Sequence, residues 1–133
     1  MKGEVHMVTS FTFVRKREEY SEEAFFERWT EHTRDFDLVD HPYISKNRLM
    51  TVAGDTPYVG IAENHWPDME SLAQTEAFYR DTERGRAHWA DLSEFMDIDN
   101  SPTVIVTREA DVGEAGITQI LSAPPISSEP VEH

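Results

Sequence analysis

The order in which two hydrophobic periodicities alternate along the chain constrains its fold most. Segments 6–14, 43–52, 58–66 and 103–107 are rich in β-branched and aromatic residues, which is typical of strands. Segments 21–36 and 68–84 repeat apolar residues at helical spacing, and Ser21 and Asp68 stand at their starts as N-caps. Gly85 interrupts the second helix, and a further helical turn precedes the last strand. A chain of 133 residues has room for one domain with a core.

This order of strand, helix, strand, strand, helix and strand predicts an α+β fold of the ferredoxin-like type. Its four-stranded antiparallel sheet would carry both helices on one face. Apolar side chains nevertheless alternate along the first strand, at Phe11 and Phe13, and along the last, at Val104 and Val106. One layer of helices covers only one face of a sheet, so we expect a homodimer in which two sheets pack face to face.

Composition excludes several classes of protein. The 12 Lys and Arg against 26 Asp and Glu leave a net charge of −14, which argues against nucleic acid or an anionic membrane as partner. The lack of cysteine excludes disulfides, thiolate catalysis and thiolate-bound metals. No stretch approaches the ~18–20 apolar residues of a membrane span, and the N-terminus lacks the apolar run of a signal peptide. We therefore expect a cytoplasmic protein.

The last 25 residues differ from the rest of the chain. Segment 109–133 holds five acidic residues, no Lys or Arg, and several Pro and Ser. Such a composition does not fold alone. We expect a domain over 1–108 and a tail over 109–133 that docks on this domain or on the partner subunit, with the apolar run at 117–121 as its anchor.

Four segments together resemble the EthD family of dimeric α+β barrel proteins. They are a strand, basic turn and helix start over 13–25, the aromatic-x-x-His of Trp29 and His32, a Gly-x-Ala-Glu strand over 60–63, and a D-x-x-x-F-x-D pattern over 91–97. The resemblance implies a pocket between sheet and helices and cofactor-independent chemistry on small molecules. In relatives that chemistry is the isomerisation of lactones or the dehydration or cyclisation of aromatic polyketide-type substrates. One departure is the polar pair Asn64-His65, where relatives continue with apolar or aromatic residues.

His32 is the strongest candidate for a catalytic residue. It follows Phe25 and Trp29 on the apolar stripe of the first helix, so its side chain should face the sheet. Burial favours the neutral imidazole, which accepts a proton near pH 7. The alternative is a core histidine bonded to a backbone carbonyl. The resemblance at this position favours a general acid or base.

The third strand offers two polar faces. His65 shares one face with Glu63, and Asn64 shares the other with Trp66. The alternation of side chains along a strand does not show which of these two faces lines the pocket. A buried Glu63 needs a cationic partner in either case. The candidates are Arg15, Arg48 and Arg108.

Residues on other elements would complete the site. Tyr43 and Asn47 share a face of the second strand, and either of them or Asn64 would steady a developing oxyanion, although an ordinary structural role explains both strand residues equally well. His88 and Asp91 have helical spacing that permits a hydrogen bond, but we expect His88 on a solvated helix face. The predicted catalytic residues are His32, Asn64 and Tyr43. The predicted substrate-binding residues are Trp29, Asn47, Trp66, Tyr79, Asp91 and Phe95.

The sequence predicts neither a metal nor another cofactor. Its six histidines are scattered and lack the spacing of common zinc motifs. A cluster of three histidines with Glu63, or a haem held by one histidine, is the alternative. The leading hypothesis is a cofactor-independent lyase, isomerase or cyclase for an aromatic or apolar small molecule. The others are a non-catalytic ligand-binding or accessory protein and a haem- or metal-dependent oxygenase.

Overall fold

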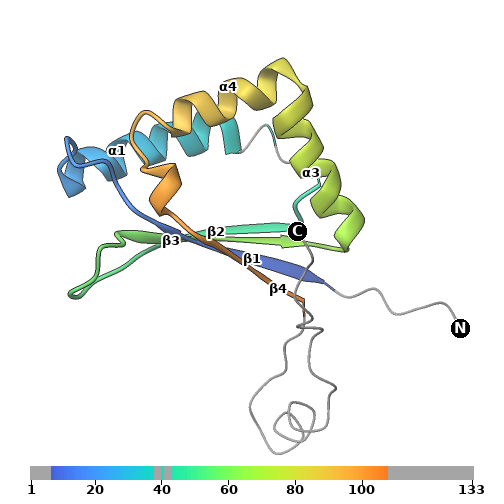
Figure 1. Cartoon of the computed structure of the whole chain (residues 1–133), viewed down its shortest axis with the longest axis horizontal. Coiled ribbons are helices and arrows are strands. Elements are labelled where there is room, and N and C mark those ends of the chain that lie inside the picture. The colour runs from blue at the N-terminus through green and yellow to red at the C-terminus, as the bar shows by residue number, and fades with distance from the viewer. Residues whose placement is uncertain (1–6, 38–39, 41–42, 108–133) are drawn as a thin grey trace, which may run out of the picture.

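The computed structural model describes residues 7–37, 40 and 43–107 (Figure 1). The strands are β1 (Val8–Val14), β2 (Lys46–Thr51), β3 (Gly60–Trp66) and β4 (Thr103–Val106). The helices are α1 (Glu22–His32), the π-helix η1 (Thr33–Asp37), α3 (Met69–Asp81), α4 (Glu83–Leu92) and the 3₁₀-helix η2 (Ile98–Asn100). The predicted tail over 109–133 lies outside the described residues.

The sheet confirms the predicted fold class. Its strand order is β2-β3-β1-β4 and every neighbouring pair is antiparallel, so the two central strands are β1 and β3. The helices α1, α3 and α4 all lie on one face of the sheet (Figure 1). This is the α+β, ferredoxin-like arrangement. None of the described helices is long and apolar enough to cross a membrane.

The first helix begins and packs as the sequence predicts. The Ser21 hydroxyl accepts a hydrogen bond from the backbone N–H of Ala24 at 3.1 Å and so caps α1. Phe25 and Trp29 are buried on its inner side, in a core that also contains Phe95. A Cβ at position 60 would lie 2.6 Å from the Trp29 ring, so only glycine lets the indole pack this close to β3.

Two helix boundaries differ from prediction. The first helix does not continue regularly to position 36, because it widens into the π-helix η1 after His32. The second helix breaks at Thr82 and not at Gly85. Thr82 is extended, and its hydroxyl caps the N–H of Gly85 at 2.9 Å, so the glycine sits inside the first turn of α4.

The second strand starts later than predicted. It begins at Lys46, so Tyr43 lies in the preceding turn and does not share a strand face with Asn47.

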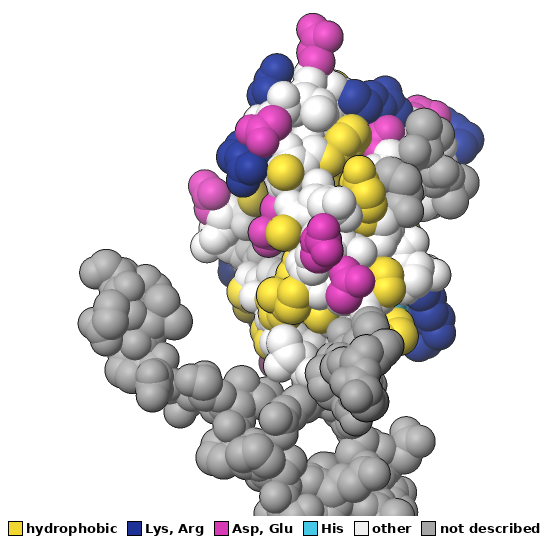
Figure 2. All heavy atoms as spheres, turned by 90° about the vertical axis from the view of Figure 1, so that its right-hand side faces the viewer, with side chains coloured by type: hydrophobic (Ala, Val, Ile, Leu, Met, Phe, Trp, Pro, Cys, Tyr) yellow, Lys and Arg dark blue, Asp and Glu magenta, His cyan; other side chains and the backbone are white. Residues whose placement is uncertain are grey.

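Figure 2 views the molecule from the right-hand side of Figure 1, the end where α3 lies. Exposed hydrophobic side chains lie there between acidic ones, and the visible Lys and Arg side chains are scattered.

Candidate functional site

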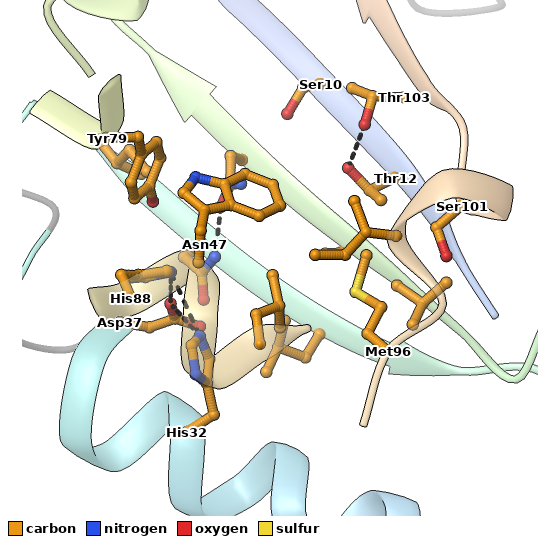
Figure 3. A pocket seen from close by; sticks show the side chains of 18 of the residues that line it. Ser10, Thr12, His32, Asp37, Asn47, Tyr79, His88, Met96, Ser101 and Thr103 are labelled. Carbon is orange, nitrogen blue, oxygen red and sulfur yellow. Dashed lines mark hydrogen bonds and ion pairs between the residues drawn. The ribbon is translucent and has the colours of Figure 1, made fainter. Parts of the chain in front are cut away.

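A cavity of about 350 Å³ lies between the sheet and the helices (Figure 3). Its polar wall on the sheet side comes from strand residues whose side chains point toward the helices. They are Ser10, Thr12, Asn47, Asn64 and Thr103. The helix side contributes His32, Trp29, Tyr79, His88, Trp89 and Leu92. A mostly apolar pocket with a few converging polar groups is the usual form of a small-molecule site.

The structure decides the face of β3 that the sequence left open. Asn64 and Trp66 line the cavity, and the amide of Asn47 donates a hydrogen bond to the Asn64 carbonyl across the strand pair. His65 and Glu63 point to the opposite face of the sheet. Of the three expected partners of Glu63, Arg48 lies 3.6 Å away.

The predicted site residues separate into three groups. Those that line the cavity are His32, Asn64, Trp29, Asn47, Trp66 and Tyr79. Two others lie behind this wall: Phe95 is fully buried in the core, and Asp91 contacts His32 from outside the cavity. Tyr43 is 38% exposed and is not a lining residue. Tyr43 is therefore not placed to stabilise an oxyanion in the cavity, because β2 begins three residues after it.

A carboxylate orients the His32 ring. His32 is 1% exposed, and its Nδ1 lies 2.8 Å from Oδ2 of Asp91, so it is bonded to a carboxylate and not, at this atom, to a backbone carbonyl. Arg28 donates to the other oxygen of Asp91 at 3.0 Å. Burial alone would raise the pKa of the Asp91 carboxyl, but the hydrogen bonds from His32 and Arg28 outweigh it and hold that pKa below its ordinary value.

His88 forms a second assembly of the same kind. It is 3% exposed, so the prediction of a solvated helix face is wrong. The break at Thr82 starts a separate helix whose inner side carries His88 to the cavity. Its Nδ1 lies 3.4 Å from Oδ2 of Asp40, and Arg84 contacts both oxygens of Asp40 at 2.9 and 3.0 Å. The bond between His88 and Asp91 that their spacing permits is not formed, and each residue belongs to a separate pair, His88 with Asp40 and Asp91 with His32.

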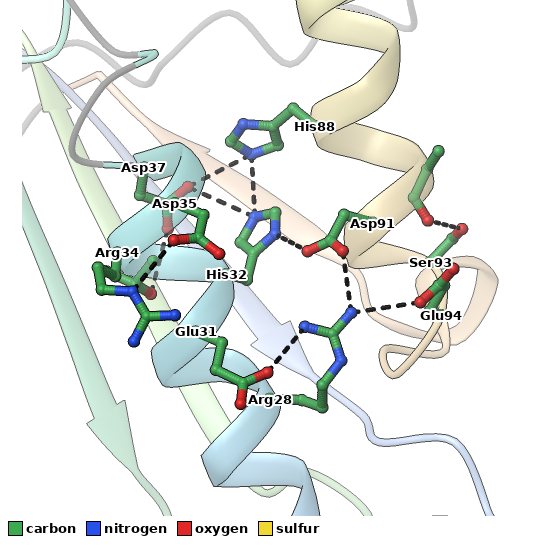
Figure 4. Close-up of polar contacts among 12 residues, drawn as sticks. Arg28, Glu31, His32, Arg34, Asp35, Asp37, His88, Asp91, Ser93 and Glu94 are labelled. Carbon is green, nitrogen blue, oxygen red and sulfur yellow. Dashed lines mark hydrogen bonds and ion pairs between the residues drawn. The ribbon is translucent and has the colours of Figure 1, made fainter.

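The two assemblies meet at Asp37 (Figure 4). The Nε2 atoms of His32 and His88 are 3.2 Å apart. Oδ1 of Asp37 lies 3.6 Å from the first and 3.3 Å from the second. A π-helix joins residue i to residue i+5, and the widened turn η1 brings Asp37 next to His32. Figure 3 shows the three side chains together at one end of the cavity.

Among the residues that the structure describes, these three side chains form a group whose donor atoms lie close enough together to hold one metal ion. The alternative weighed from the sequence, three histidines with Glu63, is not this group, because Glu63 is on the other face of the sheet. Sequence reasoning missed Asp37 and Asp40 and misplaced His88. No linear motif joins these residues, since they come from η1, from the segment after it and from α4.

Tyr79 stands beside this cluster on the cavity wall. Its ring centroid is 4.8 Å from that of His88. Burial raises the pKa of the Tyr79 phenol, and the nearby carboxylates of Asp37 and Asp40 raise it further. The phenol therefore keeps its proton and serves as a hydrogen-bond donor rather than as a base.

A second polar group, which we call the outer cluster, occupies the opposite face of the sheet. The ring of His65 contacts the Thr9 hydroxyl through Nδ1 at 3.2 Å and the Glu63 carboxylate through Nε2. Arg48 adds a contact to Glu63. Both ring nitrogens of His65 are thus engaged by neighbours on adjacent strands or on its own strand.

No protein-family model and no curated protein sequence matches the chain. Solved structures do. SnoaB, a cofactor-independent oxygenase from Streptomyces nogalater, is 13% identical, with 82% of this chain and 99% of that chain covered and a TM-score of 0.58. An EthD family protein from Bacillus halodurans is 20% identical, with 77% of this chain and 98% of that chain covered and a TM-score of 0.56.

A third structure is a dimeric protein of unknown function and ferredoxin-like fold from Bacteroides fragilis. It is 11% identical, with 77% and 96% covered and a TM-score of 0.58. At these identities the similarity concerns the fold and not the reaction. The chain therefore has the ferredoxin-like α+β fold of these proteins, and the EthD structure among them is consistent with the resemblance carried by the sequence motifs.

Proposed function

We propose that the chain is an enzyme that moves a proton on a small, largely apolar molecule held in the cavity. The observation that carries the proposal is the His32 ring, whose Nδ1 is fixed by Asp91 while its Nε2 lies at the cavity end beside His88. A histidine oriented by a carboxylate through one nitrogen and facing a pocket with the other is the usual arrangement of a general base.

The neighbours of His32 suit proton transfer. His88 stands 3.2 Å from His32 and would accept or return the same proton. Tyr79 and the amides of Asn47 and Asn64 line the cavity as donors for an oxygen that gains negative charge. These groups support abstraction of a proton next to a carbonyl, with the enolate oxygen held on the sheet side.

The cavity and the resemblance together suggest the substrate class. A volume of about 350 Å³ is at the small end for ligand pockets, and Trp29, Trp66 and Trp89 supply flat walls. We propose an aromatic polyketide-type molecule or a lactone, changed by isomerisation, dehydration or cyclisation. The resemblance to the EthD family implies that this reaction needs no cofactor. Proton transfer is proposed whether the base is the His32 imidazole or a water molecule held by His32, His88 and Asp37.

Deuterium exchange tests the proposal without knowledge of the final product. Anthrones, cyclic 1,3-diketones and unsaturated lactones are incubated with the protein in D₂O, and loss of the acidic C–H signal is followed by NMR. We expect catalysed exchange for at least one of these classes. We expect His32→Gln to lower the exchange rate by about 100-fold or more, because general bases contribute roughly 10²–10⁴-fold.

His65→Gln is the matched control, since it removes an imidazole bonded to a carboxylate on the other face of the sheet. Its exchange rate should stay within about threefold of the unmodified protein. Equal losses in both variants would contradict a specific role of His32. Ligands that bind in the cavity without any exchange would favour the alternative of a non-catalytic binding protein.

We also propose that the chain forms a homodimer through the face of the sheet opposite the helices. Phe11 pairs across strands with Val104, and Phe13 with Ile61, so apolar side chains lie side by side on this face. Val104 is 47% exposed. Light scattering should give twice the mass of the chain, and Val104→Asp should shift the protein toward monomer. A monomer at micromolar concentration in the unmodified protein would contradict this arrangement.

A further inference from the structure

We propose that His32, His88 and Asp37 bind one divalent transition-metal ion of the zinc type, through the two Nε2 atoms and a carboxylate oxygen. This inference rests on the proposed function in that it concerns the same reactive centre, and it names the cofactor of that centre. With the ion bound, the Nε2 lone pair of His32 is used in coordination, so a water on the ion would take the substrate proton in place of the imidazole. It departs from the expectation, drawn from the sequence, that the chain uses no metal.

The hydrogen bonds of the two rings set the positions of their protons. Each Nδ1 lies against a carboxylate oxygen, at 2.8 Å for His32 and 3.4 Å for His88. A carboxylate accepts hydrogen bonds, so each ring donates its Nδ1 proton to one and turns its Nε2 toward the other ring. The two Nε2 atoms face each other across 3.2 Å, next to an oxygen of Asp37. Two imidazole nitrogens and a carboxylate oxygen, donor types that bind divalent transition metals, thus converge at one largely buried place.

The spacing of these atoms fits one ion better than one proton. Two donor atoms that each lie about 2.1 Å from an ion are about 3.0 Å apart at a right angle and about 3.4 Å apart at the tetrahedral angle. The observed separations are 3.2, 3.3 and 3.6 Å. A single proton shared by the two rings would bridge only one of these three edges, whereas an ion bonds to all three atoms.

The residues behind the ligands complete the pattern. Metal-binding histidines usually donate their other N–H to a carboxylate, which fixes the ring and raises its basicity. Here both do so, to Asp91 and Asp40, and each carboxylate is in turn held by an arginine, Arg28 or Arg84. The outer cluster has no such convergence, because Glu63 and Thr9 occupy both ring nitrogens of His65.

The donor set indicates the kind of ion and where a substrate would reach it. Two imidazoles and one carboxylate without a thiolate suit zinc, iron or cobalt and are a poor set for magnesium. All three ligands line the cavity at one end, so the coordination positions they leave open face the cavity (Figure 3). An ion there would acidify a bound water or polarise a substrate carbonyl.

Zinc titration of the full-length, untagged, chelator-treated protein tests the inference. Calorimetry with Zn²⁺ should give one site per chain, and Mg²⁺ should give none. His88→Gln should weaken zinc binding by about 100-fold or more, and Asp40→Asn by about 10–100-fold. The controls His65→Gln and Glu63→Gln should bind as the unmodified protein does. Binding that survives His88→Gln unchanged, or no binding at all, would overturn the inference.

A measurement on the unmodified protein guards against variants that fail to fold. With ¹⁵N-labelled histidine, zinc should shift the Nε2 resonances of two histidines while their Nδ1 atoms remain protonated. Circular dichroism and thermal melts establish that each variant is folded before its affinity is compared. Shifts confined to histidines other than His32 and His88 would place the ion elsewhere and overturn the inference.

The exchange assay separates this inference from the proposed function. Zinc binding at the cluster without C–H exchange in either the loaded or the metal-free protein supports the metal site and contradicts the proposed function. Exchange at the full rate in a protein that binds no zinc supports the proposed function and contradicts the metal site. Exchange that falls on chelation and returns with zinc supports both.

Discussion

On each side of the sheet a histidine is bonded to a carboxylate near an arginine, yet only the side under the helices has the geometry of a reactive site. In the outer cluster, both nitrogens of His65 are used by Thr9 and Glu63. Under the helices, His32 and His88 each use one nitrogen on a carboxylate and turn the other toward Asp37 and the cavity.

This difference shows that residue types alone do not make a site. Histidine, carboxylate and arginine occur in both places, and in both the histidine and its carboxylate are at least partly buried. The inner group consists of His32, His88 and Asp37. It differs from the outer cluster because its donor atoms come from separate helices and converge on one point beside the cavity. Four predictions test whether that convergence, and not composition, sets the behaviour of each face.

Removing the Asp40 carboxylate should have the largest effect on stability. Asp40 is 5% exposed and contacts both His88 and Arg84. Asp40→Ala leaves a buried imidazole and a guanidinium without their acceptor, which should lower the free energy of unfolding by about 3 kcal/mol. Urea denaturation measures this. Glu63→Ala in the outer cluster should cost less, because the side chains of Glu63 and His65 are less deeply buried, at 10% and 16% exposed against 3% and 4% for those of Asp40 and His88. Equal losses would contradict the contrast between the faces.

Crowding the junction of α3 and α4 should disturb the inner group alone. A Cβ at Gly85 would lie 2.1 Å from the backbone oxygen of Phe78, so Gly85→Ala must push α4 away from α3. We expect a loss of about 1–3 kcal/mol in unfolding free energy and weaker zinc binding, because His88 follows one turn later.

Gly54→Ala is the control for this second prediction. Gly54 has a φ of +119° with nothing near its Cβ position, so alanine there strains the backbone far from both clusters. It should lower stability while leaving zinc affinity unchanged. If both glycine variants reduced affinity alike, the effect would follow general stability and not the placement of His88.

A single change in the outer cluster should have a modest effect. Thr9→Val removes the hydroxyl that contacts Nδ1 of His65 and keeps the shape of the side chain. We expect a loss of about 1 kcal/mol in unfolding free energy, the usual net value of one hydrogen bond, with no change in C–H exchange. A large fall in exchange would mean that the two faces are coupled.

The smallest effect concerns the pH dependence of stability in the metal-free protein. The pKa of Asp91 is lower in the folded chain than its ordinary value of 3.8. The stability that this carboxylate contributes is therefore complete above pH 3.8 and is lost as pH falls through the lower folded pKa. The melting temperature of Asp91→Asn should lie below that of the unmodified protein at pH 7, and the gap should narrow toward pH 3. A gap that stays constant would contradict this linkage.

Part of the site was predictable from local pattern. The helical stripe of Phe25 and Trp29 indicates that His32 is buried toward the sheet, and it is. The pairing of His88 could not be read the same way. Its neighbour at helical spacing, Asp91, bonds to His32 on another helix, and its actual partner Asp40 lies 48 residues earlier in the chain.

The sequence by itself determined the order of strands and helices, the capped start of α1 at Ser21 and the inward side of that helix. These follow from periodicity and from interactions between residues close in the chain. Only the tertiary structure decided that Asn64 and not His65 faces the cavity, and that Asp37, Asp40 and His88 join His32. The alternation of side chains along β3 is the same whichever face turns toward the helices, so it cannot choose between them. The path of the chain through η1 and around Thr82 depends on how the helices pack across the sheet.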